Sequence, residues 1–381
     1  MPSAKIVFPL GKYSKTIPNT CQQNSIGETV VILHKLEMTS NQTLGAALVG
    51  VGRMGQVHLK SMIDSGRLNI RWLVDIPAQH GLMAELIKRH RLTGETEISD
   101  IESSQKVLSD PRVDVVIICT PTPSHYDIIK KALTAGKHVM CEKPLTLTVS
   151  ETKDCYELAK KLKKILFCAY NRRFDKQFNT LYQRYKRGDI GNLRMVKFTS
   201  REDGPGKEYL QNNRSGIFLD MAIHDIDYVC WLVGERPSSV CAFGSISSDN
   251  SALYRSADDF DCVTAILNFP SGVMANMEDT RAARIGYEQK VEVLGTKGLI
   301  QTRNMKASEL YSITQNSCQS EALLRSSEER YVDSFPTELN HFINSIEGKE
   351  ENLVSAESCI IAMEVSEALS ESLKTGSIVR L

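Results

Sequence analysis

The sequence predicts an α/β protein with an N-terminal doubly wound domain and a C-terminal α+β domain. Between residues 44 and 169, short apolar runs alternate with segments of helical periodicity, which is typical of βαβ units and a parallel sheet. After residue 175 the strand candidates follow one another directly, which indicates an antiparallel sheet. The length of 381 residues favours two domains over a single core.

The N-terminal elements follow from the spacing of apolar residues. A parallel strand covered on both faces is a continuous apolar run, whereas a covering helix has apolar residues three and four apart. Strands are therefore expected at 44–49, 68–74, 113–119, 138–141 and 165–169, and helices at 53–65, 78–91, 100–109, 125–135 and 149–163.

The C-terminal elements follow a different order, in which most strands succeed one another without intervening helices. Turns such as Pro270-Ser271-Gly272 separate consecutive strand candidates, so neighbouring strands are expected to run antiparallel. The polar, serine-rich stretch 303–330 is expected to be a loop, and Gly376 closes the last helix. The expected strands are 194–200, 239–245, 260–269, 273–279, 289–294 and 299–302, and the expected helices are 175–187, 216–232, 334–347 and 355–374.

The charge balance and the cysteines exclude several classes of function. Lysine plus arginine and aspartate plus glutamate both number 46, so no overall field attracts nucleic acid or an acidic membrane. Ten cysteines occur without a CxxC pair or the histidine spacing of a zinc site, and we interpret them as buried thiols in a reducing compartment. No metal, nucleic-acid partner or membrane partner is expected.

The N-terminus carries no recognisable membrane or secretion signal. No apolar stretch approaches the roughly 20 residues of a membrane span, so a soluble, cytoplasmic protein is expected. Residues 1–37 are interpreted as an unstructured extension or an upstream start. Mitochondrial targeting is the alternative because acidic residues are few there, although the absence of arginine argues against it.

A glycine-rich motif ends the first predicted strand and opens the first predicted helix. In Gly50-Val51-Gly52-Arg53-Met54-Gly55, the first glycine permits a tight turn, the second allows close approach of a pyrophosphate, and the third allows close helix–strand packing. The diphosphate of a dinucleotide would then lie at the positive N-terminus of the helix.

A carboxylate follows this motif near the expected offset. Asp75 ends the next strand, 25 residues after Gly50, where it would accept hydrogen bonds from the ribose hydroxyls of adenosine. Asp75 would repel a 2′-phosphate, and the neighbouring Ile76 offers no cation to bind one. NAD is therefore favoured over NADP. The alternative is a glycine turn with a helix-capping aspartate.

The segment from Cys119 to His125 follows another strand at the same predicted sheet edge. Thr120 and His125 are therefore candidate cofactor-binding residues. An ordinary proline-rich loop with Ser124 as a helix N-cap is the alternative, and the residues alone leave both open.

The catalytic candidates lie in two segments. Cys141-Glu142-Lys143-Pro144 closes a strand at the cofactor edge, with Glu142 as a cofactor contact and Lys143 near the nicotinamide end. Asp220 and His224 share one face of a predicted helix at i, i+4 spacing. Oxidation of an alcohol needs a base for the hydroxyl proton, here His224, and a cation for the developing alkoxide, here Lys143.

Two aspartates have supporting roles in this hypothesis. Asp220 would bind the substrate hydroxyl or tune the imidazole, and Asp227 could orient the other ring nitrogen of His224. The alternative is a core histidine on a helix with acidic residues on its solvent face.

These motifs resemble the glucose-fructose oxidoreductase, inositol dehydrogenase and MocA family from about Leu44 to the C-terminus, and most of all its inositol 2-dehydrogenases. The similar segments are Gly50-Val51-Gly52-Arg53-Met54-Gly55, Cys141-Glu142-Lys143-Pro144, Asn171-Arg172-Arg173-Phe174-Asp175, Phe218-Leu219-Asp220-Met221-Ala222-Ile223-His224-Asp225, residues 281–289 and residues 291–295.

The resemblance implies a large open, mainly antiparallel sheet in the C-terminal domain. It implies that Lys143, Asp220 and His224 form the catalytic trio, that the Lys143-Pro144 bond is cis, and that Arg172 and Tyr287 line a polyol pocket. Without this resemblance, Arg172 is interpreted equally well as part of a surface ion pair, and Tyr287 equally well as an ordinary aromatic residue of the sheet. A homodimer or homotetramer formed through the outer face of the sheet is also implied.

The expected organisation is an extension at 1–40, an NAD-binding domain at 41–168 and a substrate-binding and oligomerisation domain at 169–381. The expected reaction is NAD-dependent oxidation of a secondary ring hydroxyl of a cyclic polyol, with myo-inositol to 2-keto-myo-inositol as first candidate. The segments 200–207 and 213–216 depart from the inositol enzymes, so scyllo-inositol, chiro-inositol or a pyranose sugar stay open. Another sugar dehydrogenase and a non-catalytic dinucleotide-binding regulator are the alternatives.

Overall fold

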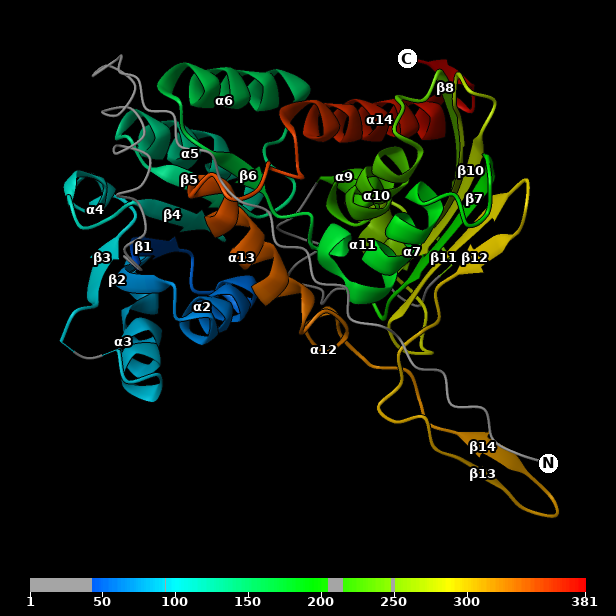
Figure 1. Cartoon of the computed structure of the whole chain (residues 1–381), viewed down its shortest axis with the longest axis horizontal. Coiled ribbons are helices and arrows are strands. Elements are labelled where there is room, and N and C mark those ends of the chain that lie inside the picture. The colour runs from blue at the N-terminus through cyan, green and yellow to red at the C-terminus, as the bar shows by residue number, and fades with distance from the viewer. Residues whose placement is uncertain (1–42, 93, 205–214, 248–250) are drawn as a thin grey trace, which may run out of the picture. The chain divides into compact units, whose positions relative to one another are not determined.

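A computed structural model describes residues 43–92, 94–204, 215–247 and 251–381, which contain two large sheets (Figure 1). The first sheet has six parallel strands in the order β3-β2-β1-β4-β5-β6. The order reverses between β1 and β4, as in doubly wound folds, which bind ligands at this point. Its strands are β1 (Leu44–Val49), β2 (Leu68–Asp75), β3 (Glu97–Asp100), β4 (Val115–Ile118), β5 (His138–Cys141) and β6 (Leu166–Cys168).

Helices connect these strands and cover the sheet. All four residues of β4 are buried, as expected for a central parallel strand with both faces covered. The connecting helices are α2 (Arg53–Ser65), the 3₁₀ turn η1 (Pro77–Gln79), α3 (His80–Arg89), α4 (Ser104–Ser109), the 3₁₀ turn η2 (Thr122–Ser124), α5 (His125–Thr134) and α6 (Val149–Leu162). The predicted doubly wound α/β fold is confirmed.

The second sheet has seven strands in the order β12-β11-β7-β10-β9-β8-β15. Neighbouring strands are antiparallel except for the parallel pair β7 and β10, so the predicted mainly antiparallel sheet is confirmed. Buried and exposed residues alternate along β9, which places one face of the sheet on the core. The strands are β7 (Leu193–Arg201), β8 (Ser239–Ser245), β9 (Cys262–Asn268), β10 (Met274–Thr280), β11 (Glu288–Gly295), β12 (Leu299–Gln301) and β15 (Val379–Arg380).

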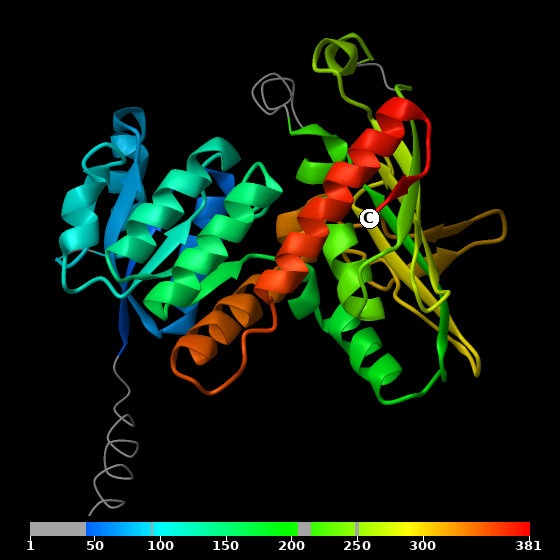
Figure 2. The ribbon, with the colours of Figure 1, turned by 90° about the horizontal axis from the view of Figure 1, so that it is seen from above.

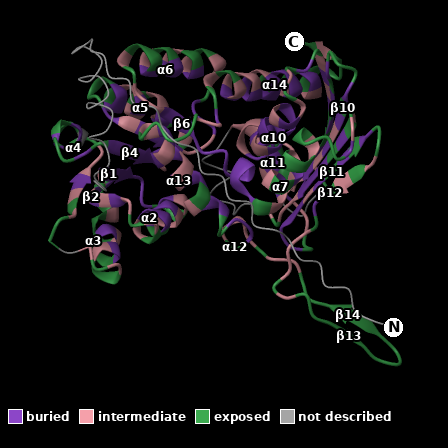
Figure 3. Cartoon of the chain, in the orientation of Figure 1, coloured by how far each residue is buried: buried purple, intermediate pink, exposed green. Residues whose placement is uncertain are grey.

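The inner face of the second sheet packs against α10 (Ile223–Val233) and α14 (Ala356–Thr375), as Figure 2 shows. The helix α14 also contacts α6, and α13 (Ser334–Ile346) packs on α2, so the C-terminal helices join both sheets. A continuous buried core results, seen as the purple strands and helix faces of Figure 3. The remaining helices are η3 (Asn171–Phe174), α7 (Lys176–Lys186), α9 (Gly216–Asp220), α11 (Ser251–Ser256) and α12 (Ser327–Arg330).

Some predicted elements differ from the structure. The predicted helix 100–109 begins only at Ser104, and Asp100 ends the short strand β3, which the sequence analysis missed. Among the described residues this strand pairs with β2 alone, at the sheet edge, and only one of its four residues is buried, so it lacks the apolar run of a central strand. The predicted loop 303–330 contains a hairpin, β13 (Tyr311–Ile313) and β14 (Cys318–Ser320), and α12.

The predicted continuous helix 216–232 is interrupted. It forms two helices, α9 and α10, separated by Met221 and Ala222. No glycine or proline marks the break. Its physical cause is a tertiary contact, because the Asp220 carbonyl accepts a hydrogen bond from the Lys143 side chain (Nζ to O, 2.6 Å) in place of one from the helix ladder.

Candidate active site

The glycine loop between β1 and α2 has the geometry of a phosphate cradle. Gly50 has φ +92°, and a Cβ there would lie 2.6 Å from the carbonyl carbon of Cys119. A Cβ on Gly55 would lie 2.0 Å from the Gly50 oxygen. A Cβ on Gly52 would meet no atom within 4 Å, so this position faces open space at the start of α2. The chain thus leaves room for an anionic group where a helix N-terminus favours one.

Asp75 stands at the carboxyl end of β2 and touches this loop. Its Oδ2 accepts a hydrogen bond from Val51 N at 2.7 Å, and its Oδ1 accepts one from Ile76 N at 2.7 Å. A carboxylate has about four lone-pair sites, so acceptor capacity remains for ribose hydroxyls. Asp75 therefore supports the loop, and its predicted contact with ribose stays a prediction.

His125 ties the loop after β4 to the loop after β5. Its Nε2 lies 2.8 Å from the Thr120 oxygen, and its Nδ1 lies 3.0 Å from the Pro144 oxygen. Burial lowers the pKa of His125, so the neutral ring donates its one N–H to one of these carbonyls at a time. Ser124 occupies the N-cap position of α5, as the alternative expected, but its side chain makes no cap hydrogen bond to the helix.

Glu142 anchors the lysine-bearing loop. Its Oε1 lies 2.7 Å from Nε2 of the buried His58 on α2, and its Oε2 accepts a hydrogen bond from Lys143 N at 3.1 Å. Burial opposes ionisation of Glu142, but His58 and Lys143 outweigh it and lower the pKa. On the same helix, exposed Arg53 pairs with Glu328, and Met54 packs against a buried aromatic cluster, Tyr287, Tyr331 and Phe335.

Lys143 spans from the first sheet to α9. It ends the segment after β5 and its ammonium group donates to the Asp220 carbonyl, as described above. The Lys143-Pro144 bond is cis, so this implication of the family resemblance is confirmed. The Asp220 side chain accepts a hydrogen bond from Arg281 (Nη2 to Oδ2, 2.5 Å), and Arg281 is 2% exposed.

His224 lies in the first turn of α10 and is half-buried. Burial lowers its pKa well below the ordinary histidine value, and the positive charges of Lys143 and Arg172 lower it further. The imidazole is therefore neutral at pH 7, which is the form that accepts a proton. Its Nδ1 is buried and has no hydrogen-bond partner among the described residues, and its ring lies edge-on to Tyr170 with centroids 6.3 Å apart.

The suggested link between Asp227 and His224 is wrong. Asp227 accepts hydrogen bonds from the buried guanidinium of Arg173, with Nε 2.9 Å from Oδ2. The neighbouring Asp225 is also buried, so these acids do not form the solvent face that the alternative assumed. A buried carboxylate requires a charged partner, and the two arginines before α7 supply it.

Arg172 and Tyr287 come from separate parts of the chain, η3 and the residue before β11. Arg172 is buried, pairs with Asp225 and lies 5.2 Å from the Phe198 ring centroid, so it is not a surface ion pair. Tyr287 precedes β11 and lies edge-on to Tyr331, with centroids 6.0 Å apart. Burial raises the pKa of Tyr287, and the positive charge of Arg172 opposes this shift.

Several polar residues of this region were missed by the sequence analysis. On the inner face of the sheet, Ser200 is the register neighbour of both Asp279 on β10 and Gln289 on β11, and all three are buried. Within the part of the chain that the structure describes, neither side-chain oxygen of Asp279 has a hydrogen-bond partner. Burial raises the pKa of Asp279 to about 7, although Arg172 and Arg281 oppose this shift. The sequence did contain one signal of this burial: Asp279 falls at an inward-facing position of a strand whose residues alternate between the two faces.

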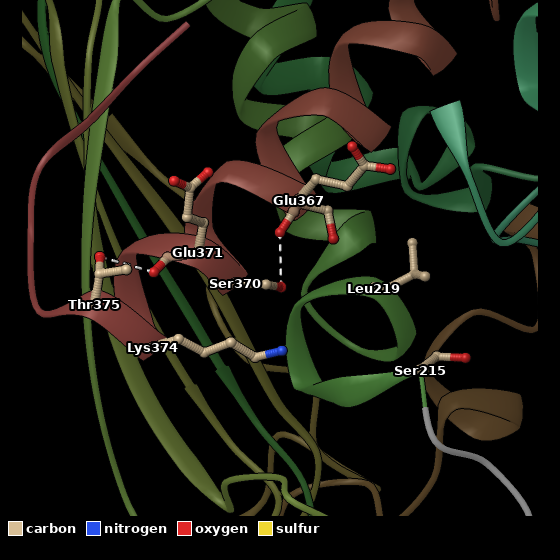
Figure 4. A pocket seen from close by; sticks show the side chains of 8 residues that line it. Ser215, Leu219, Glu367, Ser370, Glu371, Lys374 and Thr375 are labelled. Carbon is tan, nitrogen blue, oxygen red and sulfur yellow. Dashed lines mark hydrogen bonds between the residues drawn. The ribbon is translucent and has the colours of Figure 1, made fainter. Parts of the chain in front are cut away.

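A separate pocket lies between α9 and α14 (Figure 4). Ser215 and Leu219 line one side of it, and α14 contributes the other side chains. None of the three predicted catalytic side chains lines this pocket. Among the described residues, no helix is long and apolar enough to cross a membrane.

The fold and the site together define a class of protein. A glycine cradle at the switch point of a parallel sheet, with a lysine and a neutral histidine beside a second sheet, is typical of dinucleotide-dependent oxidoreductases. Family models agree: one described as "Oxidoreductase family, NAD-binding Rossmann fold" matches residues 44–170, and one described as "Oxidoreductase family, C-terminal alpha/beta domain" matches residues 184–381.

The chain belongs to the glucose-fructose oxidoreductase, inositol dehydrogenase and MocA family. It is an NAD-dependent oxidoreductase, and the predicted family, enzyme class and cofactor are confirmed. The described residues fit NAD because Gly52 faces open space at a helix N-terminus and Asp75 keeps free acceptor capacity.

The chain is similar to enzymes that act on inositols. It is 32% identical over 341 residues to the myo-inositol 2-dehydrogenase of Thermotoga maritima, covering 88% of this chain and 97% of the relative. It is 31% identical over 336 residues to the NAD⁺-dependent scyllo-inositol 2-dehydrogenase of Bacillus subtilis, covering 88% and 95%. The crystal structure of a myo-inositol dehydrogenase from Corynebacterium glutamicum superposes with a TM-score of 0.79 at 29% identity, covering 89% and 99%.

Proposed function

We propose that this enzyme oxidises a secondary ring hydroxyl of a cyclic polyol with NAD, and that its first candidate reaction is myo-inositol to 2-keto-myo-inositol. The observation that carries the proposal is the convergence of Lys143, Asp220 and His224 from separate elements, with the Lys143 ammonium 2.6 Å from the Asp220 carbonyl. The relatives named above support the class of substrate.

In this proposal the glycine loop and the loops after β2, β4 and β5 hold NAD. Gly50, Gly52 and Gly55 with Arg53 and Met54 frame the diphosphate, and Asp75 accepts from the adenosine ribose. Thr120, His125 and Glu142 shape the loops nearer the nicotinamide, through contacts among themselves and with His58. When bound, NAD accepts the hydride that leaves the carbinol carbon.

The chain's own side chains move the proton. His224, held neutral by burial and by two nearby cations, accepts the hydroxyl proton as the C–H bond breaks. The Lys143 ammonium stabilises the oxygen as it becomes negative and then forms the carbonyl. Asp220 orients the hydroxyl between them. The substrate thus loses one hydride and one proton and becomes a ketone.

Arg172 and Tyr287 are proposed to line the polyol pocket. Arg172 is held by its pair with Asp225 and its charge acts on His224, while Tyr287 is held against Tyr331. A polyol presents several hydroxyls of defined direction, and fixed donors discriminate among such isomers better than an apolar wall does.

The enzyme is also proposed to form a homodimer or homotetramer through the outer face of the second sheet. This face carries a large side chain that is at least 40% exposed on each of six strands: Met195, Phe243, Ile266, Met274, Leu294 and Leu299. Apolar patches that cross a whole sheet favour burial against another chain. Sedimentation velocity tests this proposal, and a monomer at micromolar concentration would contradict it.

The test of the reaction is NADH formation with a panel of myo-, scyllo- and chiro-inositol, glucose, galactose and xylose, repeated with NADP. Turnover restricted to inositols supports the proposal in full. Preference for an aldose keeps the mechanism and changes the substrate to the runner-up class of sugar dehydrogenases. No turnover with intact NAD binding contradicts the proposal and favours a regulator.

A further inference from the structure

The short helix α9 is fixed at its first turn by a buried carboxylate. Asp259 Oδ1 accepts hydrogen bonds from Ile217 N at 2.9 Å and from Phe260 N at 2.8 Å, and Asp259 is buried. A helix of five residues has too few internal hydrogen bonds to be stable by itself. Its position therefore depends on such external contacts.

The same carboxylate reaches the other end of α9 through one arginine. Arg281 donates to Asp259 (Nη1 to Oδ2, 2.9 Å) and to Asp220 (Nη2 to Oδ2, 2.5 Å). Asp220 is the last residue of α9, so Asp259 and Arg281 together bracket the helix at both ends. The planar guanidinium can serve two carboxylates at fixed geometry, which a lysine ammonium on a flexible stem does not reproduce.

The contacts of Asp259 and Arg281 also affect the position of Lys143. The Asp220 carboxylate is held by Arg281, and the Asp220 carbonyl accepts the Lys143 ammonium. A shift of α9 would therefore move the Asp220 side chain and the Lys143 side chain together.

From this arrangement we infer that Arg281, anchored by Asp259, is a positioning residue that sets the geometry of Asp220 and Lys143. The inference rests on the proposed function, because it assigns Arg281 a part in that reaction through its two neighbours. A purely structural arginine would change the stability of the protein without a selective effect on the chemical step.

The kinetic test compares Arg281→Gln, Arg281→Lys and Asp259→Asn with the wild-type enzyme. Arg281→Gln is expected to lower kcat on the order of 100-fold, because displacement of reacting groups by about 1 Å has that effect, while the Kd for NAD is unchanged. Arg281→Lys should restore part of this loss, and Asp259→Asn should show a smaller loss of the same kind.

The control for the loss of an arginine that joins two carboxylates is Arg112→Gln, whose side chain is 47% exposed. Arg112 also joins two carboxylates, Asp110 at 2.7 Å and Glu97 at 2.8 Å, but it precedes β4 at the amino end of the first sheet. Its replacement should leave kcat unchanged. An equal loss of kcat in this variant, or wild-type kcat in Arg281→Gln, overturns the inference.

A double-mutant cycle separates positioning from direct action. If Arg281 acts through Asp220, then Arg281→Gln should cause little further loss in an Asp220→Asn background. The same fold-change in both backgrounds overturns the inference.

A crystal structure of Arg281→Gln provides a readout that does not depend on turnover. The Asp220 carboxylate and the Lys143 ammonium should be displaced relative to the wild-type crystal structure. Unchanged positions overturn the inference. If the wild-type enzyme turns over no polyol, the proposed function fails, and this crystallographic comparison still decides whether Arg281 positions the two groups.

Discussion

The geometry of two regions is fixed in different ways. One is the glycine loop from Gly50 to Gly55, here called the cofactor loop, and the other is the region of α9, α10 and their charged partners, here called the catalytic segment. In the cofactor loop the backbone sets the geometry, and Gly50 and Gly55 are required because a Cβ would clash with neighbouring backbone. In the catalytic segment side-chain charges set the geometry, through pairs such as Arg281 with Asp220 and Arg172 with Asp225. The glycines that fix the cofactor loop lie in one short motif, whereas the charge pairs join residues from separate elements.

The largest expected effect concerns the catalytic segment. Lys143→Ala and His224→Ala should each lower kcat by about 10³-fold or more, because each removes a group that acts on the substrate oxygen or its proton in the proposed mechanism. NAD binding, measured by fluorescence titration, should survive. Lys60→Ala is the control, since Lys60 is exposed and pairs with Asp64 on the surface of α2. Near-normal turnover in either active-site variant would refute its role.

This contrast explains how much of the molecule was predictable from the sequence. The strands at 44–49 and 138–141 and the glycine motif were predicted correctly, because buried parallel strands and tight turns restrict residue type locally. The break between α9 and α10 was missed because a lysine 77 residues earlier in the chain causes it. Local periodicity carries no signal of such a contact.

The charge pairs of the catalytic segment show the same limit. Asp227 lies three residues after His224, so a link between them was a reasonable hypothesis, but Arg173 binds Asp227 instead. Arg281 lies within a segment that resembles the family, yet no spacing rule connects it to Asp220 or Asp259. Such partners become visible only when the elements that carry them are placed together in the fold.

The second prediction separates two glycines of the cofactor loop. Gly55→Ala should lower the free energy of unfolding by about 1–3 kcal/mol, because the added methyl meets backbone. Gly52 has φ −63°, which alanine adopts, so Gly52→Ala should keep the wild-type Tm. It should still raise the Kd for NAD by about tenfold or more, a loss of at least about 1.4 kcal/mol. Thermal unfolding and NAD titration of both variants measure the difference. Equal Tm changes in the two variants would contradict the assignment of open space at Gly52.

The third prediction concerns the cofactor preference. Asp75→Ala should reduce the ratio of kcat/KM for NAD to that for NADP by about tenfold, the size expected for losing a hydrogen bond to a charged group. Because Asp75 also accepts from Val51 N, Asp75→Asn is the better-matched variant for preserving the loop. An unchanged ratio in both variants would show that Asp75 only supports the loop.

The smallest expected effect is a pH dependence, and it is tested by comparing two histidines whose pKa values are lowered by burial. In the catalytic segment, the low pKa of His224 keeps the base neutral, so the acid limb of kcat/KM should lie well below the ordinary histidine pKa of about 6.5. In the first sheet, burial and the charge of Lys164 lower the pKa of His138 to about 4, and this residue has no proposed chemistry. His138 should therefore affect stability alone.

The sign of the His138 effect follows from proton binding. Between pH 6.5 and 4 the unfolded chain binds a proton at His138 and the folded protein does not, so the contribution is complete above pH 6.5 and is lost as the pH falls toward 4. The free energy of unfolding should fall by about 1–2 kcal/mol from this residue between pH 7 and pH 5, after allowance for its partial exposure. His138→Asn, which keeps an acceptor for Ile165 N, should show a smaller pH dependence in urea unfolding than the wild type or the exposed control His80→Asn. If all three proteins lose the same stability between these pH values, burial of His138 does not contribute to the pH dependence, and the contrast drawn between the two histidines is wrong.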